Sequence, residues 1–152
     1  MEKFINRKDF LSVVDTTITK KLSVLKYRFI SDPAIYDEPM DVWYVNFNDI
    51  DRMYRVIDIH TRGYGMDEIF QMAVHLNRWT TADGPGKVAD HYPKQISNVR
   101  LAPFIWNSKG SADHWWRFKD ITELREECKD VLQKIILHGI PFLDDPDSKF
   151  PY

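Results

Sequence analysis

The chain has 152 residues, of which 43% are hydrophobic and 14% aromatic, and its 21 basic and 23 acidic residues give a formal net charge of −2. This length suits a single domain spanning residues 1–152, and the absence of a basic excess excludes the electrostatic surface that nucleic-acid binding requires. No apolar run approaches the ~18 residues of a membrane span, so we expect a soluble, cytoplasmic protein without membrane contact.

Residues 7–23 carry apolar side chains at spacings of three and four, which predicts a first helix with one buried face. The stripe consists of Phe10, Leu11, Val14, Ile18 and Leu22. Asn6 precedes the stripe and is a favourable N-cap residue. Threonines at positions 16, 17 and 19 lower the helix propensity, so the stability of this helix must come mainly from packing.

Five segments that follow have the composition or the alternation of β-strands. They are Tyr27–Ile30, Met40–Phe47, Arg52–Thr61, Glu68–Arg78 and Ser97–Trp106. The turn residues Asn48-Asp49 and Gly63-Tyr64-Gly65 separate consecutive segments, which favours antiparallel pairing. We therefore predict a four- to five-stranded, largely antiparallel meander within residues 27–106.

Residues 120–143 predict a second helix with signals at both ends. Asp120 and Glu123 form an aspartate variant of the capping box. Gly139 suits a left-handed helix terminus and Pro141 follows it, so the helix is expected near residues 121–138. Its apolar stripe consists of Ile121, Leu124, Cys128, Val131, Leu132 and Ile135. Because Cys128 is the single cysteine, it cannot form an intramolecular disulfide, which fits a reducing compartment.

The change of hydrophobic period from about 3.6 to 2 and back predicts an α+β fold in which both helices cover one face of the sheet. The same periodicity predicts a common core. Its members are Phe10, Val14, Ile18, Phe70, Met72, Val74, Leu124, Cys128, Val131 and Ile135.

The five histidines are the residues best suited to acid–base or metal chemistry near neutral pH. In a hairpin centred near Tyr64, His60 and His75 are seven positions apart along the strands, or about 23 Å at ~3.3 Å per residue. Two residues so far apart cannot share a metal ion, and no other ligand spacing is present. No nucleophile elbow and no phosphate-binding loop occur either. We therefore expect neither a metal nor another cofactor.

Loop-bearing ends of the predicted sheet collect aromatic, arginine and histidine residues, the types that dominate binding hot spots. The candidate binding residues are His60, Arg62, Tyr64, Trp106, His114, Trp115 and Trp79. Trp115 and Trp116 immediately precede the last helix, so at least one of them is also a candidate staple onto the core. The loop 79–95 is long for a compact domain, which indicates either function or mobility.

The end of the chain resembles an uncharacterised bacterial α+β domain family. The resemblance is carried by His114–Phe118 with its aromatic pair, by the acidic-capped Asp120–Leu124, and by the exit Gly139–Leu143. It covers about the last thirty residues and brings no catalytic residues with it. Some similar small domains look like immunity or accessory proteins encoded beside bacterial toxins.

Two hypotheses of function follow. The leading one is a non-enzymatic module with a protein partner, of the immunity or accessory type. The alternative is a small hydrolase or ligand-binding enzyme whose site lies at the His60/His114 end of the sheet, with Tyr64 and Arg62 nearby.

Overall fold

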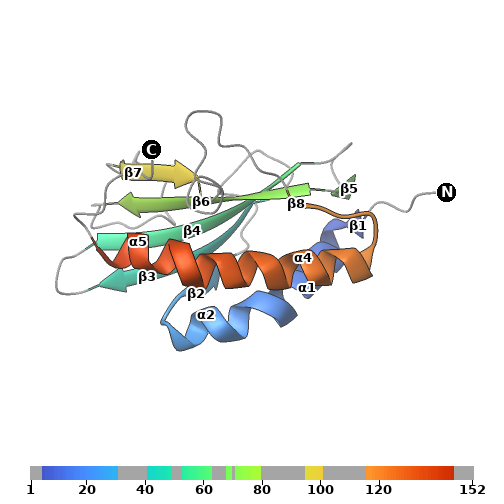
Figure 1. Cartoon of the computed structure of the whole chain (residues 1–152), viewed down its shortest axis with the longest axis horizontal. Helices are drawn as coiled ribbons and strands as arrows, with labels where there is room; N and C mark the ends of the chain where they lie inside the picture. Colours follow the sequence, from blue (N-terminus) through green and yellow to red (C-terminus); the bar gives the residue numbers. More distant parts are fainter. Residues whose placement is uncertain are drawn as a thin grey trace.

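The computed structural model has two long helices on one face of an antiparallel sheet, which confirms the predicted α+β fold (Figure 1). It describes residues 5–30, 41–48, 53–62, 68–69, 71–79, 95–100 and 116–145. No described helix contains the 18-residue apolar window that would let it cross a membrane.

The main sheet is a meander in which each strand is antiparallel to its neighbours. Its order is β2 (Arg28–Ile30), β3 (Asp41–Asn48), β4 (Met53–Arg62), β6 (Gln71–Trp79) and β7 (Gln95–Arg100). The short strand β8 (Trp116–Arg117) pairs with the start of β6, and β1 (Ile5–Asn6) pairs with β5 (Glu68–Ile69) in a separate two-stranded sheet. The predicted strands agree with these bounds to within a few residues, although residues 101–106 of the last one lie outside the described residues.

The N-terminal helix is continuous and contains one wider, π-helical turn. It consists of α1 (Arg7–Val14), the π-helical segment Asp15–Thr19 and α2 (Lys20–Val24). Asn6 caps the helix as predicted, because its Oδ1 accepts a 2.9 Å hydrogen bond from the backbone N–H of Asp9. The hydroxyls of Thr19 and Tyr44 are 3.0 Å apart and link this helix to β3.

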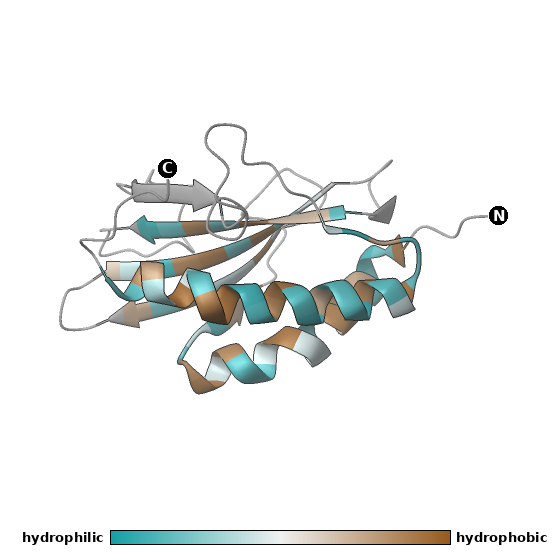
Figure 2. Cartoon of the chain, in the orientation of Figure 1, coloured by the Kyte–Doolittle hydropathy of each residue, from teal (hydrophilic) through white to brown (hydrophobic). Residues whose placement is uncertain are grey.

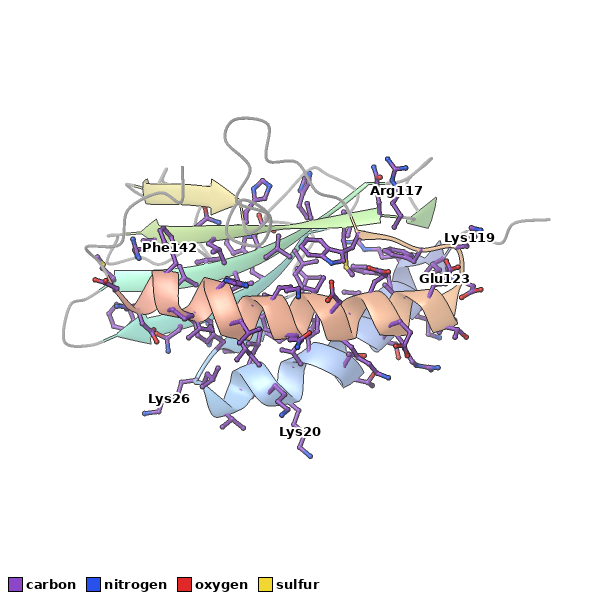
Figure 3. All side chains as sticks on the ribbon, in the orientation of Figure 1. Lys20, Lys26, Arg117, Lys119, Glu123 and Phe142 are labelled. Atoms are coloured by element: carbon purple, nitrogen blue, oxygen red, sulfur yellow. The ribbon has the colours of Figure 1, made fainter. Side chains whose placement is uncertain are left out.

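The C-terminal helix has the same three-part construction. It consists of α4 (Ile121–Lys134), the π-helical segment Ile135–Gly139 and α5 (Ile140–Asp144). Asp120 accepts a 2.8 Å hydrogen bond from the backbone of Glu123, as the capping box predicts. The Glu123 carboxylate accepts a 2.7 Å bond from the backbone of Lys119, and Figure 3 shows these two residues together at the start of α4.

The predicted helix end at Gly139 is wrong. Gly139 has helical angles, with φ −73° and ψ −50°, and the helix continues to Asp144. Pro141 is tolerated because it occupies the first turn of α5, directly after the π-helical segment, where a missing N–H costs little. The backbone becomes extended only at Asp145.

The main core lies between the helices and the sheet. Nine of the ten predicted core residues are buried in it, and the tenth, Phe70, lies outside the described residues. Polar and apolar residues alternate along both helices, as helices with one buried side require (Figure 2). Ile121 is the exception in the predicted stripe, since it remains 36% exposed at the start of α4.

Candidate functional site

Alternate residues of the strands lie on the side of the sheet turned away from the helices, which we call the far face. Its apolar centre is a small cluster of Trp43, Val45 and Val56, separate from the main core. Strand pairing arranges far-face residues in rows across the sheet. In one row, Asp58 of β4 lies between Trp43 of β3 and His75 of β6.

His60 and His75 are close together on this face, so the predicted separation of about 23 Å is wrong. Their ring centres are 5.9 Å apart, the ring planes are inclined by 29°, and both side chains are partly exposed. Arg62 pairs with Gln71, so His60 is opposite Ala73 and is a diagonal neighbour of His75.

This register has a tertiary cause. Residues 68–69 form β5, which pairs with β1 near the N-terminus and not with β4. The β4–β6 connection is therefore longer than a tight turn at Gly63–Gly65, and the midpoint of the hairpin lies further along the chain than Tyr64. The local turn signal could not reveal this, because it contains no information about β1.

Asp58 belongs to the same patch as the two histidines. Its side chain is 7% exposed, it is directly opposite His75, and it precedes His60 by two residues on β4. A carboxylate beside imidazoles can accept their ring N–H groups and fix their orientation. We call Asp58, His60 and His75 the histidine patch.

At the other end of the sheet, strand pairing places three aromatic residues opposite one another. Phe47 of β3 is opposite Tyr54 of β4, which is opposite Trp79 of β6; we call these residues the aromatic row. The Phe47 and Tyr54 rings are 4.6 Å apart, and Phe47 is 37% exposed. The Asn48-Asp49 turn, combined with antiparallel pairing, was the signal that could have placed Phe47 opposite Tyr54.

Three of the seven predicted binding residues can be placed. His60 and Arg62 lie at the end of β4 that pairs with the start of β6, whereas Trp79 ends β6 opposite Tyr54. Six positions on β4, about 20 Å, separate Tyr54 from His60, so the backbone positions of Trp79 and His60 lie at different ends of the sheet. The other four lie outside the described residues: Tyr64, Trp106, His114 and Trp115.

Trp116 has the staple role that was predicted for one member of the tryptophan pair. It is 2% exposed in the main core, and its indole N–H donates a 2.9 Å hydrogen bond to the Asp130 carboxylate of α4. This bond satisfies the polar edge of a buried ring and fixes β8 against the helix. Trp116 is therefore part of the core and not of a binding surface.

On the helix-covered face, two buried arginines hold the end of the C-terminal helix. Arg55 and Arg78 are directly opposite each other on β4 and β6, with exposures of 4% and 3%. Arg55 Nε donates to the carbonyl of Leu143 at 2.8 Å, and Arg78 donates to the carbonyls of Phe142 and of Asp145, the latter at 2.6 Å. The Arg78 guanidinium also lies 4.2 Å from the centre of the Phe142 ring, and Figure 3 shows Phe142 where α5 meets the sheet.

These contacts identify the arginine pair as a structural cap. The last carbonyls of a helix lack partners within the helix and carry partial negative charge, which cations stabilise. Burial, and secondarily the charge of Arg55, lower the pKa of Arg78. Burial, and secondarily Asp144, raise the pKa of the neighbouring Tyr27 hydroxyl. The sequence did contain a signal for the burial of Arg55. Arg55 precedes the core residues Ile57 and Ile59 by two and four positions, so all three lie on the same side of β4.

Cys128 is expected to be chemically silent in the folded protein. It is fully buried, and burial raises the pKa of its thiol to about 12. A thiol-specific disulfide reagent at pH 8 should modify Cys128 only after unfolding, because thiolate and access are both lacking. Since the folded-state pKa exceeds the unfolded value of about 8.5, the stability from the buried thiol is complete below pH ~8.5 and is lost as the pH rises toward 12.

The matched control for this prediction places a thiol on the exposed side of the same helix. Gln133→Cys in a Cys128→Ala background should react with the same reagent within minutes in the native state, because residue 133 is exposed. Rapid modification of native Cys128 would contradict the assignment of this residue to the core.

Among the described residues, no group of three or more histidine, cysteine, aspartate or glutamate side chains is arranged to hold a metal ion. The chain is thus an α+β protein whose far face carries two candidate sites, the histidine patch and the aromatic row. Comparisons with family models, with curated proteins and with solved structures gave no match.

Proposed function

We propose that this chain is a non-enzymatic protein-binding module and that the aromatic row on the far face is the centre of its binding surface. The partner class that we propose is a bacterial toxin, with this protein as its immunity or accessory protein. The observation that carries the proposal is the Phe47–Tyr54 pair, which is packed at 4.6 Å and yet leaves Phe47 37% exposed.

Exposed aromatic pairs of this kind suit protein recognition. Aromatic side chains are enriched in interface centres because they bury a large area with few rotatable bonds. Tyr54 packs against the apolar cluster of the far face, so one side of the pair is already ordered before a partner binds. The placement of Trp79 opposite Tyr54 adds a third aromatic position to the same row.

The layer arrangement also favours this face. The two helices cover the other side of the sheet, where the core and the arginine pair lie (Figure 1). Lys20 and Lys26 of the helical layer are exposed and extend away from the sheet (Figure 3). Most of the described residues of the far face are themselves buried, and Phe47 is the large hydrophobic side chain among them that remains exposed. We therefore place the partner surface at the Phe47 end of the far face and not on the charged outer side of the helices.

The test uses as its probe the purified protein encoded by the gene next to the one for this chain, where a toxin partner is expected. We expect a one-to-one complex by size-exclusion chromatography, and at least tenfold weaker binding by calorimetry for the variant Phe47→Ala/Tyr54→Ala, the size of effect typical of hot-spot residues. Leu25→Ala is the matched control, because Leu25 is 41% exposed but follows α2 on the helical side. Unchanged thermal unfolding of both variants shows that the fold is retained.

Two outcomes would contradict the proposal. Equal binding by the Phe47→Ala/Tyr54→Ala variant, with a loss in Leu25→Ala, would move the interface to the helical layer. No complex with the adjacent gene product would remove the immunity interpretation.

The alternative function is a small hydrolase or ligand-binding enzyme that uses His60. It is favoured by the histidine patch, where two partly exposed imidazoles lie beside a buried carboxyl, as acid–base chemistry near neutral pH requires. This alternative predicts turnover or binding of a small molecule that is lost in His60→Ala and retained in Phe47→Ala.

A further inference from the structure

The histidine patch brings together two imidazoles that had been predicted from the sequence to lie too far apart to share a metal ion. His60 and His75 come from neighbouring antiparallel strands, and their diagonal positions bring the ring centres to 5.9 Å. Both rings are partly exposed, so an ion in solution can reach them. The reason for excluding a shared metal ion was a separation of about 23 Å, and that separation is wrong.

The distance between the rings fits a shared ion. A metal–nitrogen bond of about 2.0–2.1 Å places an imidazole ring centre roughly 3.2 Å from the metal. Two such rings are then about 5.2 Å apart at a tetrahedral angle and about 6.4 Å apart when they are opposite each other. The observed 5.9 Å lies between these limits. The rings are stacked with an inclination of 29°, so ion binding requires at least one imidazole to rotate about its side-chain torsions until a nitrogen of each ring points at the ion.

Strand pairing places Asp58 beside both histidines, in the position of the supporting group that metal-bound histidines usually have. A carboxylate next to such histidines accepts the second ring N–H, fixes the tautomer and offsets the charge of the ion. Asp58 is directly opposite His75, two residues from His60, and buried. In this role Asp58 orients the ligands and is not itself a ligand.

We propose that His60 and His75 bind one divalent first-row transition-metal ion, with water in the remaining coordination positions and Asp58 as a positioning residue. Two imidazole ligands suit copper, nickel and zinc, and affinity should be greatest for Cu²⁺. This inference is independent of the protein-binding function, because the histidine patch and the aromatic row lie at different ends of the far face.

The test is calorimetric titration of the full chain with CuCl₂, NiCl₂ and ZnCl₂ in a non-chelating buffer. We expect one equivalent to bind, most tightly for Cu²⁺, with nitrogen hyperfine structure in the Cu²⁺ paramagnetic resonance spectrum. His60→Ala and His75→Ala should each weaken binding at least tenfold, and Asp58→Asn should weaken it about tenfold through ligand orientation.

His138→Ala is the matched control, because His138 is partly exposed but lies in the π-helical segment of the C-terminal helix. This variant should bind the ion as the unmodified protein does. If His60→Ala or His75→Ala unfolds, glutamine at the same position provides a second, more conservative variant.

Three results would overturn the proposal: no binding of any of the three ions, unchanged binding by the His60→Ala/His75→Ala double variant, or loss of binding in His138→Ala. The second result would assign the ion to other side chains of the chain. A failure of the protein-interaction test leaves each of these outcomes unaffected, so the two proposals can be judged separately.

Discussion

Replacement of Arg78 by alanine is expected to lower the free energy of unfolding by about 3–5 kcal/mol. Arg78 is 3% exposed and donates to main-chain carbonyls at the end of α5. Without it, the carbonyls of Phe142 and Asp145 lose a charged donor, at about 1–3 kcal/mol each, together with the contact over the Phe142 ring. The measurement is urea unfolding followed by circular dichroism.

Comparison with Arg55→Ala makes this prediction specific to the cap. Arg55 donates to the carbonyl of Leu143, which also lies 3.5 Å from Nε of Arg78. The ion pair of Arg55 is with Asp144 at 4.0 Å, and the Asp144 side chain is 66% exposed. Such an exposed pair contributes little, so Arg55→Ala should cost only about 1–2 kcal/mol. Lys129→Ala is the surface control and should be within about 0.5 kcal/mol of the unmodified protein, because the pair that Lys129 makes with Glu126 is exposed on both sides.

The location of the damage can be measured as well. In Arg78→Ala, amide hydrogen exchange should accelerate in residues 140–145 and remain slow in α4, since only the last turn depends on the arginine pair. A near-neutral Arg78→Ala variant with unchanged exchange in residues 140–145 would show that α5 is held by its apolar residues alone.

Leu124→Ala is expected to destabilise the protein by about 2–5 kcal/mol. Leu124 is fully buried in the core between α4 and the sheet, so truncation removes apolar contacts and leaves a cavity. Thermal or urea unfolding measures the effect. Alanine has a high helix propensity, so the loss reports packing and not a weakened helix.

Ile121→Ala is the control on the same helix. Ile121 is one turn earlier and 36% exposed, so its truncation should cost less than about 1 kcal/mol. Equal effects at the two positions would mean that the buried side of α4 has been assigned incorrectly.

Local signals predicted the helices and most strands because neighbouring residues decide them. Asn6 and Asp120 were identified as caps from residue type and position alone, and both accept the expected backbone hydrogen bond. The stripes on the two helices and the alternation in β6 correctly predicted which residues meet in the core. Hydrophobic periodicity is sufficient for these residues, since side chains on one stripe face the same layer; Ile121, at the start of α4, is the exception.

The candidate site could be predicted only in part. His60 was singled out from the sequence, but its neighbour on the far face, His75, was placed about 23 Å away. The error was one of register, because β5 pairs with β1 and lengthens the connection that precedes β6. A shift in register changes every cross-strand neighbour, so a site composed of such neighbours is the least predictable feature of a sheet.

By itself, the sequence determined the fold class, the two helical stripes, their N-terminal caps and the members of the core. The tertiary structure alone decided where the last helix ends and which polar residues meet. Gly139 and Pro141 favour a helix end at that point, yet the helix continues to Asp144. The physical reason is that two arginines from distant strands bind the terminal carbonyls, and the stability of these buried, charge-assisted hydrogen bonds exceeds the weaker local preference of a glycine and a proline.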